Sequence, residues 1–255
     1  MDLAYRLNDH SKLGQAFRKI FQPATYLLIG SIVKIALLRH RLKIINRDVL
    51  ISAWKDRPPG TPLITVSNHH SCLDDFILFG SLFSLTDLTK GIPIWRTVRD
   101  LRSRKLIHKG GGVDQPSMNF TLQVLNQGGW VHIFPQGRII HPFEFDRESN
   151  FRLKWGVGRL LAESNVLPLV LPIWHCGLEL LNPSETFSTF ETLRRIIGKP
   201  RTLTIAVEYR NHQRSEAETR REVHSLLTAL VQAALYSLKS TTELEHQHHF
   251  HGPDA

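Results

Sequence analysis

Short apolar runs rich in β-branched and aromatic residues recur along the chain, and segments with helical character separate them. The runs cover 63–67, 130–134, 167–174 and 203–209. The helical segments cover 75–85, 117–126, 151–164 and 217–239. Strands that alternate with helices are typical of α/β folds, and 255 residues suffice for one sizeable core. We therefore expect an α/β domain over residues 48–240, with a central mixed sheet flanked by helices.

Residues 1–47 differ in charge from the rest of the chain, with nine Lys/Arg against two acids. They include an apolar run, 26–38, that Lys34 interrupts and that is shorter than the roughly 20 residues a membrane-spanning helix needs. We expect a basic amphipathic helix that lies in a membrane interface, whereas an ordinary core helix is the alternative. The residues expected near lipid headgroups are Arg39, His40, Arg41 and Lys43.

The formal net charge of +9 suits an anionic surface, either phospholipid or nucleic acid. Nucleic-acid binding is not expected, because no known motif is present and aromatic residues do not interleave with Lys/Arg. Two cysteines, Cys72 and Cys176, cannot build a disulfide framework. The composition thus favours a globular protein that meets a membrane surface.

The C-terminal segment, 241–255, reads as a polar, His-rich tail, and we expect it to be disordered. Its histidines do not follow the spacing of a structural zinc site. We therefore expect no metal there, and no cofactor elsewhere in the chain. The histidines concerned are His246, His248, His249 and His251.

The segment that follows the first apolar run places two histidines and two aspartates within seven residues. His69 and Asp74 are five residues apart, and so are His70 and Asp75. Either pair could form a His–Asp dyad, and spacing alone does not choose between them. Ser71 with Asp74 also fits a helix capping box, which would explain these two residues structurally.

A His–Asp dyad in this position has a clear chemical use. If a strand ends near His69 and Asp74 lies in the first turn of the next helix, the carboxylate can fix one ring nitrogen of the histidine. The other nitrogen is then available to take a proton from a hydroxyl group. This arrangement favours acyl transfer to an alcohol, although a lone pair with this spacing often occurs by chance.

The segment 68–74, Asn-His-His-Ser-Cys-Leu-Asp, resembles the Asn-His-x-Ser-x-x-Asp signature of the glycerolipid acyltransferase family. Three further blocks, 129–137, 152–163 and 167–177, resemble one transacylase of that family. The resemblance extends over about residues 44–210 and implies a single glycerolipid-acyltransferase-like domain. It selects His69 and Asp74 as catalytic, because the family's histidine directly follows the asparagine.

The resemblance implies that the chain moves acyl groups between phospholipids and lysophospholipids without coenzyme A. The expected substrates are phosphatidylcholine, monolysocardiolipin and cardiolipin. The expected location is a mitochondrial membrane, on the intermembrane-space side and without spanning it. The expected substrate-binding residues are Asn68, Ser71, Phe134, Pro135, Gln136, Gly137 and Arg138.

Two departures from the family pattern leave other functions open. Gln136 stands where the family has Glu, and a strand with a Pro-Val-x-Arg-Gly segment is missing before Gly110, where only the basic run 96–109 remains. A coenzyme A-dependent lysophospholipid acyltransferase is one alternative. A catalytically weak lipid-binding relative is the other. If the family Glu only accepts a hydrogen bond from a hydroxyl or a backbone N–H, Gln136 can replace it. If the Glu must hold an arginine by its charge, Gln136 impairs function.

Overall fold

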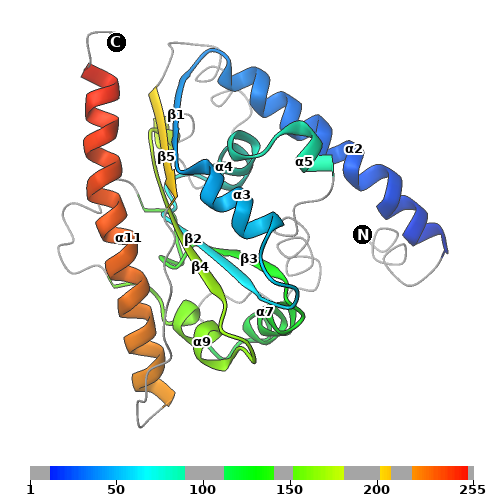
Figure 1. Ribbon diagram of the computed structural model, residues 1–255, viewed down its shortest axis with the longest axis vertical. Coiled ribbons are helices and arrows are strands. Elements are labelled where there is room, and N and C mark those ends of the chain that lie inside the picture. Colours follow the sequence, from blue (N-terminus) through cyan, green and yellow to red (C-terminus); the bar gives the residue numbers. More distant parts are fainter. Residues whose placement is uncertain (1–11, 90–111, 141–151, 181–201, 208–219, 252–255) are drawn as a thin grey trace.

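The computed structural model of the chain describes residues 12–89, 112–140, 152–180, 202–207 and 220–251. These residues form one mixed sheet with helices on both of its faces (Figure 1). The strands are β1 (Arg41–Ile45), β2 (Leu63–Ser67), β3 (Trp130–Ile133), β4 (Leu169–Cys176) and β5 (Thr202–Val207). The helices are α2 (Lys12–Leu37), α3 (Arg47–Lys55), α4 (Asp74–Leu82), α5 (Leu85–Thr89), α7 (Pro116–Asn126), α9 (Gly156–Glu163), η1 (Leu178–Leu180) and α11 (Arg220–His251).

The strand order is β1-β5-β4-β2-β3. β2 lies parallel to both neighbours, with Thr65 opposite His132 on β3 and Leu171 on β4. β4 and β5 are antiparallel, and β1 is parallel to β5. The expected mixed α/β sheet is therefore confirmed for the described residues.

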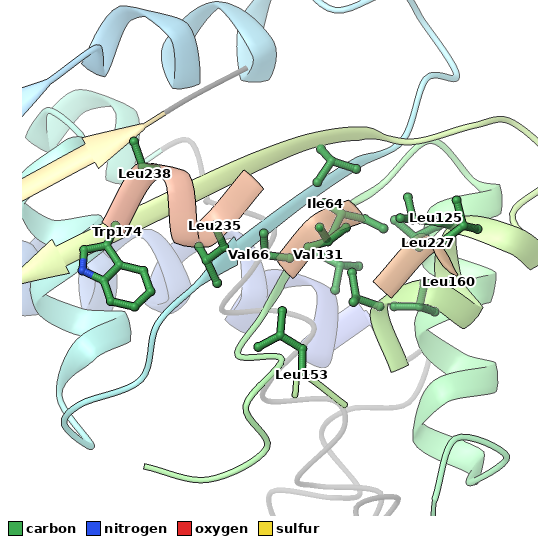
Figure 2. Packing of buried hydrophobic residues seen from close by; sticks show 14 of the residues in the cluster. Ile64, Val66, Leu125, Val131, Leu153, Leu160, Trp174, Leu227, Leu235 and Leu238 are labelled. Carbon is green, nitrogen blue, oxygen red and sulfur yellow. The ribbon is translucent and has the colours of Figure 1, made fainter. Parts of the chain in front are cut away.

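The side chains of β2 alternate between two cores. Ile64 and Val66 point to the face covered by α9 and α11, where they pack with Trp174 and Leu235 (Figure 2). Leu63 points to the opposite face, where α3 and α4 pack. Because both faces are covered, β2 is buried along its whole length.

The helix α2 packs against α4 and α5 and extends away from the sheet (Figure 1). Its buried side contributes Val33 and Leu37 to a small core with Ile77 of α4. Its other side exposes large apolar residues, namely Leu28, Ile32 and Ile35, with Leu38 just past its end. Among the described residues, no helix combines the length and the apolar character needed to cross a membrane.

The structure differs from the sequence-based expectations at three places. The segment 41–45 is a strand that pairs with β5, so Arg41 and Lys43 belong to β1 rather than to a membrane helix. α3 was not expected. The tail from residue 241 to 251 continues α11 and is not disordered, because Thr242 is buried and Lys43 pairs with Glu245.

The basic run 96–109, which stands where the family has a further strand, lies outside the described residues.

Candidate active site

His69 and Asp74 lie at the carboxyl end of β2, and they contact each other. The Nδ1 atom of His69 is 2.9 Å from Oδ2 of Asp74. The other candidate pair, His70 and Asp75, faces different residues. His70 Nδ1 lies 3.7 Å from Oε2 of Glu179, and Asp75 Oδ1 lies 4.0 Å from Nε2 of His132. The geometry therefore favours the His69–Asp74 pair over the His70–Asp75 pair.

Backbone amides hold the Asp74 carboxylate in place. Its Oδ2 atom accepts hydrogen bonds from the N–H groups of His70, at 2.7 Å, and Ser71, at 2.9 Å. The carboxylate is fully buried, and this burial acts to raise its pKa. Electrostatic attraction to His175 and the hydrogen bonds from His69 and Ser71 outweigh burial, so the pKa of Asp74 is lowered. Asp74 is therefore ionised at neutral pH.

The loop 134–140 fixes His69 at three points. The Phe134 ring stacks on the His69 ring with centroids 3.9 Å apart. The backbone N–H of His69 donates to Oε1 of Gln136 at 2.6 Å, and its carbonyl accepts from the N–H of Ile140 at 2.8 Å. Since Nδ1 donates to Asp74, the Nε2 atom is the ring's proton acceptor, and the side chain is 20% exposed.

The contact made by Gln136 bears on the first departure from the family pattern. Its side chain is buried, and its oxygen accepts from a backbone N–H rather than from a cation. A neutral amide oxygen serves this purpose as a carboxylate would. Its Nε2 atom is buried without a hydrogen-bond partner in the described part of the chain.

Asn68 connects β2 to β4 beyond the end of their regular pairing. Its Oδ1 accepts from the backbone N–H of His175 at 3.0 Å, and its Nδ2 donates to the His175 carbonyl at 2.8 Å. The His175 ring returns a third hydrogen bond, from Nε2 to the Asn68 carbonyl at 3.0 Å. Burial lowers the pKa of His175 to about 4, so this ring is neutral and its Nε2 carries the proton.

The placement of Asn68 and Ser71 does not match direct contact with substrate. Both side chains are fully buried, and Ser71 Oγ accepts from the backbone N–H of Leu73 at 3.2 Å. Ser71 and Asp74 form one half of the expected capping box, because the carboxylate accepts from the Ser71 N–H. Asn68 and Ser71 position the dyad, because internal hydrogen bonds occupy their polar atoms.

His132 lies behind the dyad and was not expected there. Its Nδ1 is 2.8 Å from Thr65 Oγ1, and its Nε2 is 3.2 Å from Ser67 Oγ. Because the Trp130 indole N–H donates to Thr65, the threonine hydroxyl is left to donate to the His132 ring. Burial lowers the pKa of His132 to about 3, so the ring is neutral. The period-2 pattern of 130–134 was the signal that could have placed it beside Thr65.

The remaining predicted binding residues lie in the loop after β3. Pro135 is buried and its carbonyl accepts from the N–H of Lys154 at 2.8 Å. Gly137 adopts a φ of 74°, in the left-handed region, and Arg138 is exposed. The structure thus brings Phe134 and Gln136 to His69 directly and places Gly137 and Arg138 at the surface beside them.

This arrangement can perform general-base catalysis. A histidine whose Nδ1 is fixed by a carboxylate can take a proton at Nε2, and the carboxylate stabilises the resulting imidazolium. The neighbouring neutral histidines do not compete for this proton near pH 7, because burial lowers the pKa values of His132 and His175 to about 3 and about 4.

The model of the family described as Acyltransferase matches residues 48–175. The chain is 31% identical over 238 residues to a tafazzin from Drosophila melanogaster, covering 86% of this chain and 61% of that protein. It is 38% identical over 165 residues to an N-acylphosphatidylethanolamine synthase from Arabidopsis thaliana, and the match covers 59% of this chain and 57% of that protein. It is 32% identical over 177 residues to a taffazin from Dictyostelium discoideum, and the match covers 62% of this chain and 60% of that protein. The chain thus spans about three fifths of the length of these relatives.

Proposed function

The chain belongs to the Acyltransferase family, and we propose that it transfers fatty acyl groups between phospholipids and lysophospholipids without coenzyme A. The observation that carries this proposal is the His69–Asp74 contact at 2.9 Å, with the carboxylate fixed by two backbone amides. The transacylase that the sequence blocks resemble is tafazzin, and relatives of that name match here.

In the proposed reaction, Nε2 of His69 takes the proton from the free hydroxyl of a lysophospholipid. The hydroxyl oxygen attacks the ester carbonyl of the donor phospholipid, which forms a tetrahedral intermediate. Collapse of the intermediate breaks the donor ester bond, and the leaving alkoxide takes the proton back from His69. Asp74 keeps the ring oriented and stabilises its charged form throughout. The transfer therefore consumes no proton and no cofactor.

We further propose monolysocardiolipin and phosphatidylcholine as the acceptor and donor, so that cardiolipin is the product. The proposed location is a mitochondrial membrane, on the intermembrane-space side and without spanning it. The net charge of +9 favours a surface that contains an anionic lipid such as cardiolipin.

The exposed side of α2 supports attachment to a membrane surface. Leu28, Ile32 and Ile35 follow one another at helical spacing and face outward. The buried side of the same helix packs through Leu37 with Ile77, three residues after Asp74. We therefore propose that α2 lies in the membrane interface and holds the dyad close to it.

A second candidate follows from one of the relatives. The similarity to an N-acylphosphatidylethanolamine synthase suggests an amine as an alternative acyl acceptor. His69 can take a proton from an attacking amine as it can from a hydroxyl. The product distinguishes the two reactions, because an amide resists mild alkaline hydrolysis and an ester does not.

The experiment that tests the proposal is acyl exchange in liposomes. Purified protein is mixed with acyl-labelled phosphatidylcholine and monolysocardiolipin, with and without added coenzyme A, beside a His69→Ala control. We expect label in cardiolipin without coenzyme A, and none with the control. Transfer that occurs only when labelled acyl-coenzyme A replaces labelled phosphatidylcholine as the donor would favour the coenzyme A-dependent alternative.

Two further outcomes of this assay distinguish the remaining functions. Label in an alkali-resistant amide, when phosphatidylethanolamine is added, would favour the second candidate. No transfer of any kind by folded, liposome-bound protein would leave a lipid-binding relative and would refute the proposed enzyme.

A further inference from the structure

The segment 152–155 lies directly against the loop that holds His69. The backbone N–H of Lys154 donates to the Pro135 carbonyl at 2.8 Å. The aliphatic part of the Lys154 side chain covers Gly137, where a Cβ atom would lie 3.2 Å from Lys154 Cγ. Lys154 is therefore fixed next to Gln136, whose side chain accepts from the His69 N–H.

An internal anchor sets the direction of this segment. Leu153 is buried, and its backbone N–H donates to Oε1 of Gln232 on α11 at 2.9 Å. Its two neighbours, Arg152 and Lys154, are both exposed. Trp155 follows them and is 42% exposed, which is unusual for the largest apolar side chain.

The charge of this segment is not neutralised within the described residues. Neither Arg152 nor Lys154 forms an ion pair there, whereas Arg159, one turn further along, is fully engaged with Glu163 and Asn119. Arg138, on the same loop as Gly137, is also exposed and has interactions of its own. An exposed tryptophan beside several cations is typical of surfaces at the level of lipid headgroups.

We propose that Lys154, assisted by Arg152, binds the phosphate of the phospholipid whose glycerol oxygen reaches His69, with Trp155 at the level of the headgroups. This inference rests on the proposed function, since one glycerol unit separates the phosphate from the reacting oxygen. Lysine binds phosphate as a point charge and needs no fixed fork of donors. Lys154 then selects phosphorylated glycerolipids over neutral glycerides.

The test compares Lys154→Gln with Lys154→Arg and with Arg221→Gln, an exposed cation at the start of α11. Gln keeps much of the aliphatic stem over Gly137, so the loop is expected to stay folded. Initial rates are measured with a soluble short-chain lysophospholipid and with a monoacylglycerol of the same chain length as acceptors.

We expect Lys154→Gln to raise the KM for the lysophospholipid by about tenfold and to leave kcat within about twofold, because it removes binding that ground state and transition state share. Lys154→Arg should restore the KM, and Arg221→Gln should not change it. Rates with the monoacylglycerol should be the same in all four proteins. An unchanged KM in Lys154→Gln, or an equal loss with the neutral acceptor, would refute the proposal.

A binding measurement separates this inference from the proposed reaction. A short-chain diether phospholipid carries the headgroup but no transferable acyl group, so its Kd is defined even if the protein transfers nothing. We expect Lys154→Gln to weaken this Kd by about tenfold, as expected for the loss of one charge-assisted contact. Equal Kd values would refute the phosphate contact. Inorganic phosphate that binds wild type as tightly as the diether lipid would refute the headgroup assignment.

Discussion

Two of the histidine–carboxylate contacts in the described part of the molecule differ in form, because only one of them leaves the histidine accessible. In the dyad, His69 Nδ1 lies 2.9 Å from Asp74. Between α9 and α11, His224 Nε2 lies 3.3 Å from Glu163, in a group with Arg159 and Arg220 that we call the ionic seam. The distances are similar, so the difference must come from the other partners.

Those partners differ in charge and in access. The Asp74 carboxylate accepts from neutral backbone N–H groups and from one histidine, and that histidine is 20% exposed. The Glu163 carboxylate accepts from the guanidinium groups of Arg159 and Arg220, and His224 is buried. A carboxylate already neutralised by two cations gains little from a protonated histidine. Neutral hydrogen-bond donors on the acid and an accessible base therefore distinguish the His69–Asp74 pair from the ionic seam.

The strongest test of this comparison removes the base itself. We expect His69→Ala to lower acyl transfer by about a thousandfold, since general-base catalysis typically contributes factors of this order. The free energy of unfolding should fall by only about 1–2 kcal/mol, because the buried Asp74 carboxylate loses one hydrogen bond but keeps those from two backbone N–H groups. Liposome assays and urea titrations measure the two effects. A variant that keeps most of its activity would show that His69 is not the base.

The next largest effect, on stability, is expected from Gly158→Ala, beside the His224 residue of the ionic seam. A Cβ atom at this position would lie 2.0 Å from the His224 carbonyl oxygen and 2.5 Å from Thr228 Oγ1, so α9 and α11 would have to separate. We expect a loss of about 3 kcal/mol in the free energy of unfolding, measured by urea denaturation. Gly156→Ala is the control, because its nearest neighbour is the flexible end of Met118. Equal losses in both variants would contradict the close helix contact.

The stability of the molecule should depend on pH through His175, whose Nε2 lies 3.7 Å from Oδ2 of Asp74. Burial lowers the pKa of His175 from 6.5 to about 4, so the unfolded chain binds more protons than the folded chain between these values. The contribution of His175 to the free energy of unfolding is therefore fully present above about pH 6.5. This contribution, about 3 kcal/mol, is lost as the pH falls toward 4. Urea titrations at several pH values measure the slope. In His175→Asn, the free energy of unfolding should depend less on pH between 4 and 6.5 than in wild type. An equal pH dependence in both proteins would show that His175 does not cause it.

A smaller effect is expected from Glu163→Gln in the seam. The substitution removes the negative charge shared by Arg159 and Arg220 and leaves Arg159 buried with less compensation. Because the Glu163 side chain is still 24% exposed, we expect a loss of about 2 kcal/mol rather than the full cost of a broken buried pair. Transfer activity per folded molecule should not change. A loss of activity at constant stability would mean that the seam takes part in the reaction.

The smallest effect is expected from Arg220→Gln. This side chain is exposed and pairs with Glu163 and with the exposed Asp114, so solvent screens both contacts. We expect a thermal midpoint that can hardly be distinguished from that of wild type. A shift as large as that of Glu163→Gln would show that the seam depends on its exposed cation as much as on its buried one.

The contact between His69 and Asp74 is local, but the same spacing joins His70 and Asp75, so only the family motif distinguished the two pairs. Five residues separate His69 from Asp74, and a strand end followed by a helix start brings them together. The mixed α/β sheet followed from the alternation of apolar runs with helices. The family assignment followed from motifs in the correct order, which the match over 48–175 confirms.

The parts that could not be predicted depend on distant partners. The Asn68–His175 contact exists because β2 and β4 are neighbours in the sheet, and no sequence pattern near either residue predicts it. The cations Arg41 and Lys43 suggested a lipid surface, yet they belong to a strand and Lys43 pairs with Glu245. The polar residues of the tail remain helical because Thr242 is buried and α11 packs on the sheet.

The pairing of β1 with β5 has a consequence for how the chain folds during synthesis. Arg41 lies opposite Thr202, so β1 emerges from the ribosome long before the strand that completes it. At roughly 5–20 residues per second, the early strand waits for on the order of ten seconds or more with an unpaired edge. Such an edge can pair with another chain in the meantime. The two charged residues of β1, Arg41 and Lys43, are then useful while the sheet is still incomplete, because they discourage aggregation of a strand that has no partner yet.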